Sequence, residues 1–126
     1  MKFDKNILSQ FIGTEAYHRW NSFSRFSMTD GVYYMAEAGN CFWLFDIVAS
    51  AQYLSEIKRH KSFIVWRIEV AEDSSCVVTA YLDGPYVEAN MLYRQRVPRT
   101  DFATNTGLTE FNFWQEGNIL LLPSEH

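Results

Sequence analysis

The sequence predicts an α+β protein in which N-terminal helices pack on one face of an antiparallel sheet of about five strands. Apolar residues in the first half of the chain recur at three- and four-residue steps, which is the spacing of one helix face. In the second half they alternate at two-residue steps, as in strands with one buried face. Short polar turns separate these strands, so successive strands are expected to be antiparallel neighbours.

Before residue 30 the sequence predicts one short helix and a hairpin. Asp4 is suited to cap a helix that runs to about residue 11, because its carboxylate can accept a hydrogen bond from a free N–H of the first turn. Gly13 is the expected end, since glycine is common just past a helix terminus. The aromatic stretches 15–20 and 24–29 flank a short break and predict an additional N-terminal hairpin.

The most apolar stretch of the chain predicts the central helix of the core. Thr29 or Asp30 would first cap a short helix over residues 32–38. From residue 41 to about residue 60 apolar residues recur at helical spacing, and the first part of this stretch is apolar on nearly all sides. A helix of that kind packs on more than one side, whereas its basic tail is expected to reach solvent.

The second half of the chain predicts five strands. They span residues 62–70, 76–82, 88–97, 108–115 and 119–122, with a loop over residues 98–107. In the first of them Ile64, Trp66 and Ile68 alternate with the other residues and are expected to face the core.

Length and composition limit the classes of protein that the chain can represent. A chain of 126 residues fits a single domain over residues 1–126. The net charge of −4 argues against a sequence-independent nucleic-acid coat, for which a basic face is expected. Aromatic residues make up 17% of the chain, which exceeds what a core requires, so some are expected to face a partner.

Other features favour a cytoplasmic protein. No apolar run is long enough for a membrane span, and the charged first residues do not resemble a signal peptide, so no membrane contact is expected. Cys41 and Cys76 lie in apolar surroundings without ligand-like spacing, which is typical of buried free thiols in a reducing compartment.

Three dispersed residues have the chemistry for a small enzyme, if the fold brings them together. His18 titrates near neutral pH, and Glu37 and Asp46 are carboxylates that can share a proton with it. No nucleophile, phosphate-loop or metal-ligand signature accompanies them. We therefore predict no catalytic residue, metal or cofactor, and an enzyme is the less favoured interpretation.

A broader polar cluster adds Arg19 and Asp30 to these three residues. The simpler interpretation gives each acid a structural role. Asp30 would be a helix cap, and Asp46 would lie on an exposed stripe or pair with Arg19 or Arg25, because an unpaired buried carboxylate is costly.

Arg94, Arg96 and Arg99 cluster around one predicted strand and its exit. A row of arginines can hold phosphates through the planar donor fork of the guanidinium, and neighbouring aromatic rings can stack on bases. A nucleic-acid-binding protein is thus one alternative. The other interpretation is a solvated outer face of the sheet.

Four blocks of the sequence resemble an uncharacterised family, described only as a domain of unknown function, of small bacterial, phage and plasmid proteins. The blocks are FIGTE with YHR (11–15, 17–19), TDGV with YMAEAG (29–32, 34–39), FWLFDIVAS (42–50) and LLLPSE (120–125). The acidic residues typical of the family match Asp30, Glu37 and Asp46, and its basic pair matches His18 and Arg19. Residues 83–107 match least. The resemblance implies no activity.

The resemblance implies the setting of a mobile element and favours an accessory protein that acts by protein–protein contact. Its sharpest form is an inhibitor of a bacterial defence complex, such as an anti-CRISPR protein. The partner would be a host or defence protein. The expected anchors are exposed aromatic residues with arginines beside them, namely Tyr86, Tyr93, Arg94, Arg96 and Trp114. A homodimer that buries these rings in its own interface is a further alternative.

Overall fold

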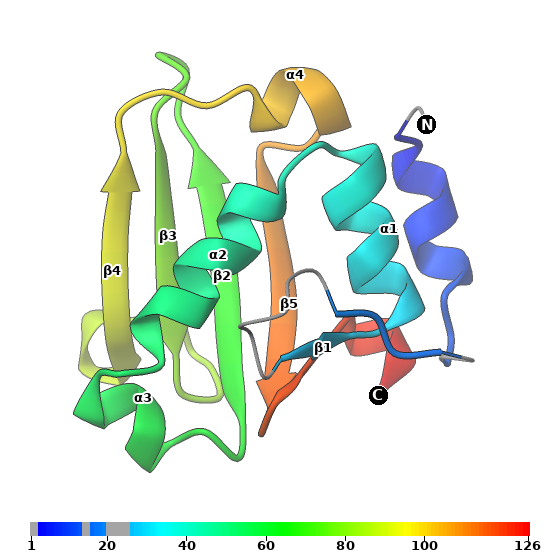
Figure 1. The fold of residues 1–126 in the computed structure, drawn as a ribbon. Coiled ribbons are helices and arrows are strands. Elements are labelled where there is room, and N and C mark those ends of the chain that lie inside the picture. The colour runs from blue at the N-terminus through cyan, green and yellow to red at the C-terminus, as the bar shows by residue number, and fades with distance from the viewer. Residues whose placement is uncertain (1–2, 14–15, 20–25) are drawn as a thin grey trace.

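The computed structural model describes residues 3–13, 16–19 and 26–126. In this part of the chain, helices lie against one face of a six-stranded sheet whose order is β1-β6-β5-β2-β3-β4 (Figure 1). The predicted α+β class is therefore confirmed. The strands are β1 Ser27–Met28, β2 Ile64–Val70, β3 Cys76–Tyr81, β4 Met91–Val97, β5 Glu110–Glu116 and β6 Ile119–Leu121.

Five of these strands coincide with the predicted ones, and their neighbours are antiparallel. The sixth strand changes the topology, because β1 runs parallel to β6 and makes the sheet mixed. β1 falls within the predicted N-terminal hairpin, of which residues 15 and 20–25 lie outside the described residues. The described part shows an antiparallel bridge between His18 and Met28.

The helices are α1 Asp30–Ala38, α2 Phe42–Ala51, α3 Ser55–Arg59 and α4 Phe102–Thr106, with short 3₁₀ helices η1 Lys5–Gln10, η2 Glu88–Asn90 and η3 Pro123–Glu125. α1 matches its prediction. Asp4 caps η1 as expected, because its Oδ1 accepts a hydrogen bond from the Asn6 N–H at 2.9 Å. The helix ends at Gln10, before Gly13.

The prediction of one helix over residues 41–60 was wrong, because α2 ends at Ala51 and α3 begins at Ser55. Between them the Gln52 side chain turns back, and its Nε2 donates to the Val48 carbonyl at 3.0 Å and to Gln115 Oε1 at 3.2 Å. This side chain satisfies a terminal carbonyl of α2 and ties the helix end to the sheet. A single helix over residues 41–60 would place Leu54 on the same apolar face as Leu44 and Val48, but Leu54 is 44% exposed.

The core lies between α1, α2 and the sheet, and contains one buried polar side chain at its centre. Phe45 of α2 packs edge-on against Phe113 of β5, with ring centroids 5.0 Å apart. Trp66 of β2 is fully buried, and its Nε1 donates to Gln115 Oε1 at 2.9 Å. Gln115 Nε2 in turn donates to Gln52 Oε1 and to the Gly117 carbonyl, both at 3.0 Å. The buried carboxamide is thus fully hydrogen-bonded.

The C-terminal segment holds the start of α1. The Glu125 carboxylate accepts hydrogen bonds from Thr29 Oγ1 at 2.5 Å, from the Gly31 N–H at 3.0 Å and from the Leu122 N–H at 3.0 Å. A carboxylate at this position also interacts favourably with the positive end of the helix dipole. Residues 94 positions apart in the sequence are therefore joined by one side chain.

Both cysteines are free and buried, as the sequence predicts. Burial raises the pKa of the Cys41 thiol to about 12, because the charged thiolate loses its hydration. Burial also raises the pKa of Cys76. Within the described residues no helix is both long and apolar enough to cross a membrane.

We expect Gly39→Ala to destabilise the fold by about 1–3 kcal/mol, because overpacking a tight site costs about that much. A Cβ at Gly39 would lie 2.6 Å from the Met35 carbonyl oxygen and 3.0 Å from Thr106 Cγ2. Gly13→Ala is the matched control, since a Cβ there meets no atom of the described residues within 4 Å. Urea unfolding of both variants measures the difference, and equal stabilities would contradict the packing described here.

The two thiols should react very slowly with a soluble disulfide reagent in the native protein and rapidly after unfolding. The unfolded thiol has a pKa of about 8.5, so unfolding releases a proton above this pH that folded Cys41 retains. The contribution of Cys41 to stability is therefore complete below about pH 8.5 and declines as the pH rises toward its folded value of about 12. Rapid labelling of Cys41 in the native state would show that it is not buried.

Candidate functional site

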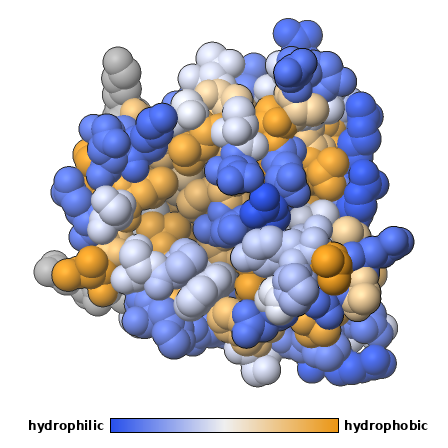
Figure 2. Space-filling model, turned by 180° about the vertical axis from the view of Figure 1, so that it is seen from behind, coloured by the Kyte–Doolittle hydropathy of each residue, from blue (hydrophilic) through white to orange (hydrophobic). Residues whose placement is uncertain are grey.

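The sheet face turned away from α2 carries none of the helices α1–α4 and is partly covered by the β3–β4 loop with its short 3₁₀ helix η2 (Figures 1 and 2). We call it the open face. Figure 2 shows a hydrophilic cluster near the middle of this side, with hydrophobic patches around it. The cross-strand pairs define its residues, which are Val65, Arg67 and Glu69 of β2, Val77, Thr79 and Tyr81 of β3, Arg94 and Arg96 of β4, and Glu110, Asn112 and Trp114 of β5.

Arg67 forms the centre of the open face. Its Nε lies 3.1 Å from Glu69 Oε1, and one terminal nitrogen lies 2.8 Å from Glu110 Oε2. Its other terminal nitrogen donates to Asn112 Oδ1 at 3.1 Å. Burial disfavours the charge of this side chain, which is only 17% exposed, but the acidic neighbours outweigh it and raise the pKa of Arg67. The positive charge of Arg67 is thus balanced by carboxylates of the same protein.

The loop between β3 and β4 covers part of the open face with one aromatic ring. The Tyr86 ring lies over the Arg67 guanidinium, 5.1 Å from Cζ to the ring centroid, and contacts Tyr81 with centroids 5.3 Å apart. A cation over an aromatic face is attracted by the ring quadrupole. Tyr81 is nearly buried, whereas Tyr86 remains 44% exposed. Tyr86 is therefore an exposed ring that is held in place by Arg67.

Trp114 lies at the other side of the open face, half-buried between two rings. Phe63 and His126 both meet it edge-on, with centroids 5.1 Å and 5.3 Å away. His126 Nε2 also lies 3.0 Å from Glu116 Oε1. Trp114 is therefore less available as an anchor than Tyr86.

Arg94 and Arg96 lie exposed on β4, at the edge of the sheet. Their cross-strand neighbours are the uncharged Thr79 and Val77. Neither arginine forms an ion pair within 4 Å among the described residues. Both side chains are thus less engaged within the protein than Arg67, although the charge of Arg96 helps to lower the pKa of Asp73.

Two residues predicted to share this surface lie elsewhere. Tyr93 projects to the opposite side of β4, where its ring packs on Trp66 at 6.0 Å and its hydroxyl donates to Gln95 Oε1 at 2.6 Å. Arg99 lies beyond the end of β4 and lines a cleft beside α2. Strand alternation separates Tyr93 from Arg94, and the turn after β4 separates Arg99 from both arginines.

The predicted polar cluster is partly assembled at the start of α1. His18 Nε2 lies 2.8 Å from Asp30 Oδ1, and the His18 ring stacks on Tyr33 with centroids 4.3 Å apart. A hydrogen bond with Glu37, together with its negative charge, raises the pKa of Tyr33. Asp30 is the first residue of α1 and Thr29 is its N-cap, so the expected capping role of Asp30 was wrong and its carboxylate contacts His18 instead.

The remaining members of that cluster do not extend it into a pocket. Arg19 and Asp46 are both exposed, and the Asp46 backbone carbonyl accepts a hydrogen bond from Ser50 Oγ at 2.9 Å. Arg25, the alternative partner for Asp46, lies outside the described residues. Among the residues that are described, no three potential metal ligands are grouped so that they could hold an ion.

Sequence reasoning missed two residues that organise the structure. Arg67 was recognisable as an outward residue of an alternating strand, but its acidic partner Glu110 is 43 positions away. Glu125 lies in a terminal segment with no helical or strand period, and no local signal connects it with the start of α1.

The fold and the open face define an α+β protein with one sheet face against helices and the other bearing a paired arginine, the exposed Tyr86 ring and two arginines without an ion pair among the described residues. The chain belongs to a family of unknown function, DUF6876, whose family model matches residues 2–126. The resemblance to an uncharacterised family is confirmed at this level. No curated protein matches the chain, and no solved structure matches it either.

Arg67→Gln should release the β3–β4 loop from the open face. We expect a loss of stability of about 1 kcal/mol, because both acidic partners are exposed and such ion pairs are individually weak. The sharper effect should be faster amide hydrogen exchange over residues 82–90, which lose the contact between Arg67 and Tyr86. Arg94→Gln is the control and should change neither quantity. Unchanged exchange in the Arg67 variant would show that Arg67 does not hold the loop.

Proposed function

We propose that this chain is a small accessory protein that acts by binding another protein through the open face and the adjacent edge of β4. The observation that carries this proposal is the placement of exposed Tyr86 on the same face as Arg94 and Arg96, which have no ion-pair partner among the described residues. Tyrosine and arginine are the residue types that most often dominate protein–protein binding energy.

Charge supports a partner that presents carboxylates. Arg67 is already engaged by Glu69 and Glu110, so its positive charge is largely compensated. Arg94 and Arg96 lie two residues apart on one strand face, and they match acidic residues at alternate positions of an extended segment. Guanidinium groups bind carboxylates through two parallel hydrogen bonds, which provides orientation as well as attraction.

The edge of β4 supports the same kind of contact. β4 pairs only with β3 among the described strands, so its other side can accept a further strand. Strand addition of this type uses backbone hydrogen bonds for affinity and alternate side chains for specificity. An antiparallel pairing of two β4 edges would bring arginines of both copies together, which disfavours a homodimer through this edge.

A protein partner is favoured over nucleic acid by the composition of the open face. Arg67 is engaged by Glu69 and Glu110, so the open face offers a phosphate backbone the two arginines Arg94 and Arg96, whereas nucleic-acid binding usually relies on several phosphate contacts. Arg99, the third arginine of the nucleic-acid hypothesis, lines a cleft on the other side of the sheet.

Our sharper proposal is that the partner belongs to a bacterial defence complex and that binding inhibits it, as an anti-CRISPR protein would. This form is motivated by the setting of a mobile element that the sequence resemblance implies. Inhibition by occupying a surface requires no catalytic group. It requires only a rigid face with anchors, and the sheet supplies that rigidity.

Reversing the charge of Arg94 and Arg96 together should strongly weaken partner binding. Tagged full-length protein is used to purify partners from a lysate of the source cells, with mass spectrometry to quantify them. We expect one stoichiometric protein, reduced by about tenfold or more in the Arg94→Glu, Arg96→Glu variant, since a lost charge-assisted pair is worth about a factor of ten.

The control variant carries Lys5→Glu and Lys58→Glu, which change the net charge by the same amount at exposed positions away from the open face. It should retain the partner. Recovery of no stoichiometric protein, or equal recovery with both variants, would reject binding through the open face.

A further inference from the structure

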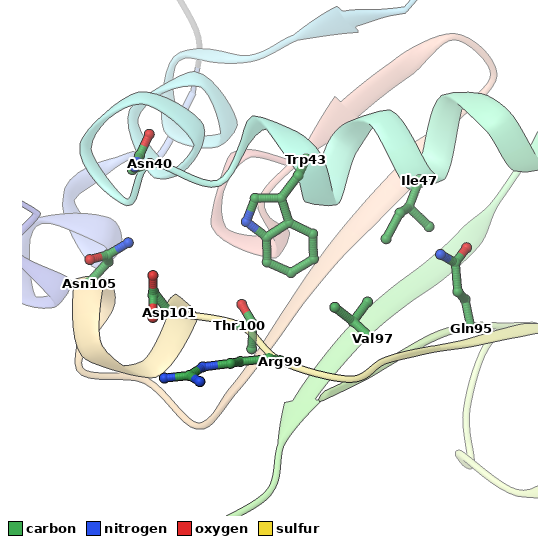
Figure 3. A pocket seen from close by; sticks show the side chains of 9 residues that line it. All are labelled: Asn40, Trp43, Ile47, Gln95, Val97, Arg99, Thr100, Asp101 and Asn105. Atoms are coloured by element: carbon green, nitrogen blue, oxygen red, sulfur yellow. The ribbon is translucent and has the colours of Figure 1, made fainter. Parts of the chain in front are cut away.

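A cleft of about 650 Å³ lies on the helix-covered side of the sheet, between α2, the end of β4 and α4 (Figure 3). Its volume is within the range of about 300–1,000 Å³ that is typical of small-molecule sites. It lies on the opposite side of the sheet from Arg94 and Arg96, so its occupation is independent of the proposed protein contact.

One end of the cleft is apolar. Figure 3 shows the Trp43 indole projecting from α2 into the cleft, with Ile47 one turn further along the helix and Val97 of β4 facing it. All three side chains are half-buried and pack against the core, so packing holds this side of the cleft in place. An indole ring and two branched side chains suit an apolar or aromatic group of a ligand.

The other end of the cleft is polar and carries one charge of each sign. Arg99, Asp101 and Asn105 gather there, on and just before α4 (Figure 3). Arg99 and Asp101 do not form an ion pair within 4 Å with each other or with another described residue. The guanidinium is suited to a carboxylate, and the Asp101 carboxylate is suited to an ammonium group.

We propose that this cleft binds a free α-amino acid with an apolar or aromatic side chain. Arg99 holds its carboxylate, Asp101 holds its ammonium group, and the side chain lies against Trp43, Ile47 and Val97. The two charges of the cleft cancel, so the site favours a zwitterion over a ligand that carries only one charge. The neighbouring carboxamide of Asn105 supplies further donors and an acceptor for orientation.

The ligand test compares L-phenylalanine with three analogues that each lack one of its features. Phenethylamine lacks the carboxylate, 3-phenylpropionate lacks the ammonium group, and glycine lacks the side chain. Titrations follow the chemical shifts of the backbone amides and of the Trp43 indole N–H in the labelled full-length protein. We expect L-phenylalanine to bind about tenfold or more tightly than each analogue, the factor expected for one lost charged contact.

Substitutions of the two exposed charged residues then test which group of the ligand each residue binds. Arg99→Gln should weaken L-phenylalanine binding about tenfold while leaving phenethylamine binding unchanged. Asp101→Asn should weaken L-phenylalanine to a similar extent while leaving 3-phenylpropionate unchanged, and asparagine retains the N-cap position of α4. Arg94→Gln, on the open face, is the control and should leave all affinities unchanged.

Three results would overturn the proposal. One is the absence of chemical-shift changes in Trp43 and its neighbours at about 10 mM L-phenylalanine. This result would mean a dissociation constant well above that concentration. The second is equal affinity for L-phenylalanine and either single-charge analogue. The third is unchanged binding in both charge variants. None of these results depends on whether the open face binds a protein.

Discussion

The carboxamide of Gln115 determines how α2 lies on the sheet. It connects the end of α2 through Gln52, the indole of Trp66 in β2 and the Gly117 carbonyl in the turn after β5. A buried amide without these partners would cost about 1–3 kcal/mol for each unsatisfied group, so the arrangement is strongly specified. Because α2 occupies this face, the opposite face of the sheet is left to the β3–β4 loop and to the C-terminal residue. The cleft beside Trp43 depends on the same placement of the helix.

The arginines of the open face differ in whether they form ion pairs within the protein. Arg67 is engaged by contacts within the chain: it neutralises Glu69 and Glu110 and supports the Tyr86 ring. Arg94 and Arg96 form no ion pair within 4 Å among the described residues, although the charge of Arg96 helps to lower the pKa of Asp73. Charges at a sheet edge also hinder association of identical edges. A surface of this kind resists self-pairing, and under the proposed function it would recognise an acidic partner.

Local periodicity was sufficient to predict the parts of the fold that depend on neighbouring residues. The alternation of Ile64, Trp66 and Ile68 correctly identified the buried face of β2. It could not reveal contacts between distant segments. The parallel pairing of Met28 with Leu120 and the bond between Gln52 and Gln115 join residues far apart in the sequence, and the second of these ends the helix that periodicity extended. The cleft was missed for the same reason, because Trp43 and Arg99 meet only in the folded chain.

Hydrogen exchange of the protein alone and in complex with its purified partner tests the central claim most directly. If the open face and the β4 edge form the docking surface, the partner should slow exchange of amides in β4 and in residues 82–90, while α1 and α2 exchange as before. Protection confined to α1 or α2, with β4 unchanged, would contradict this account.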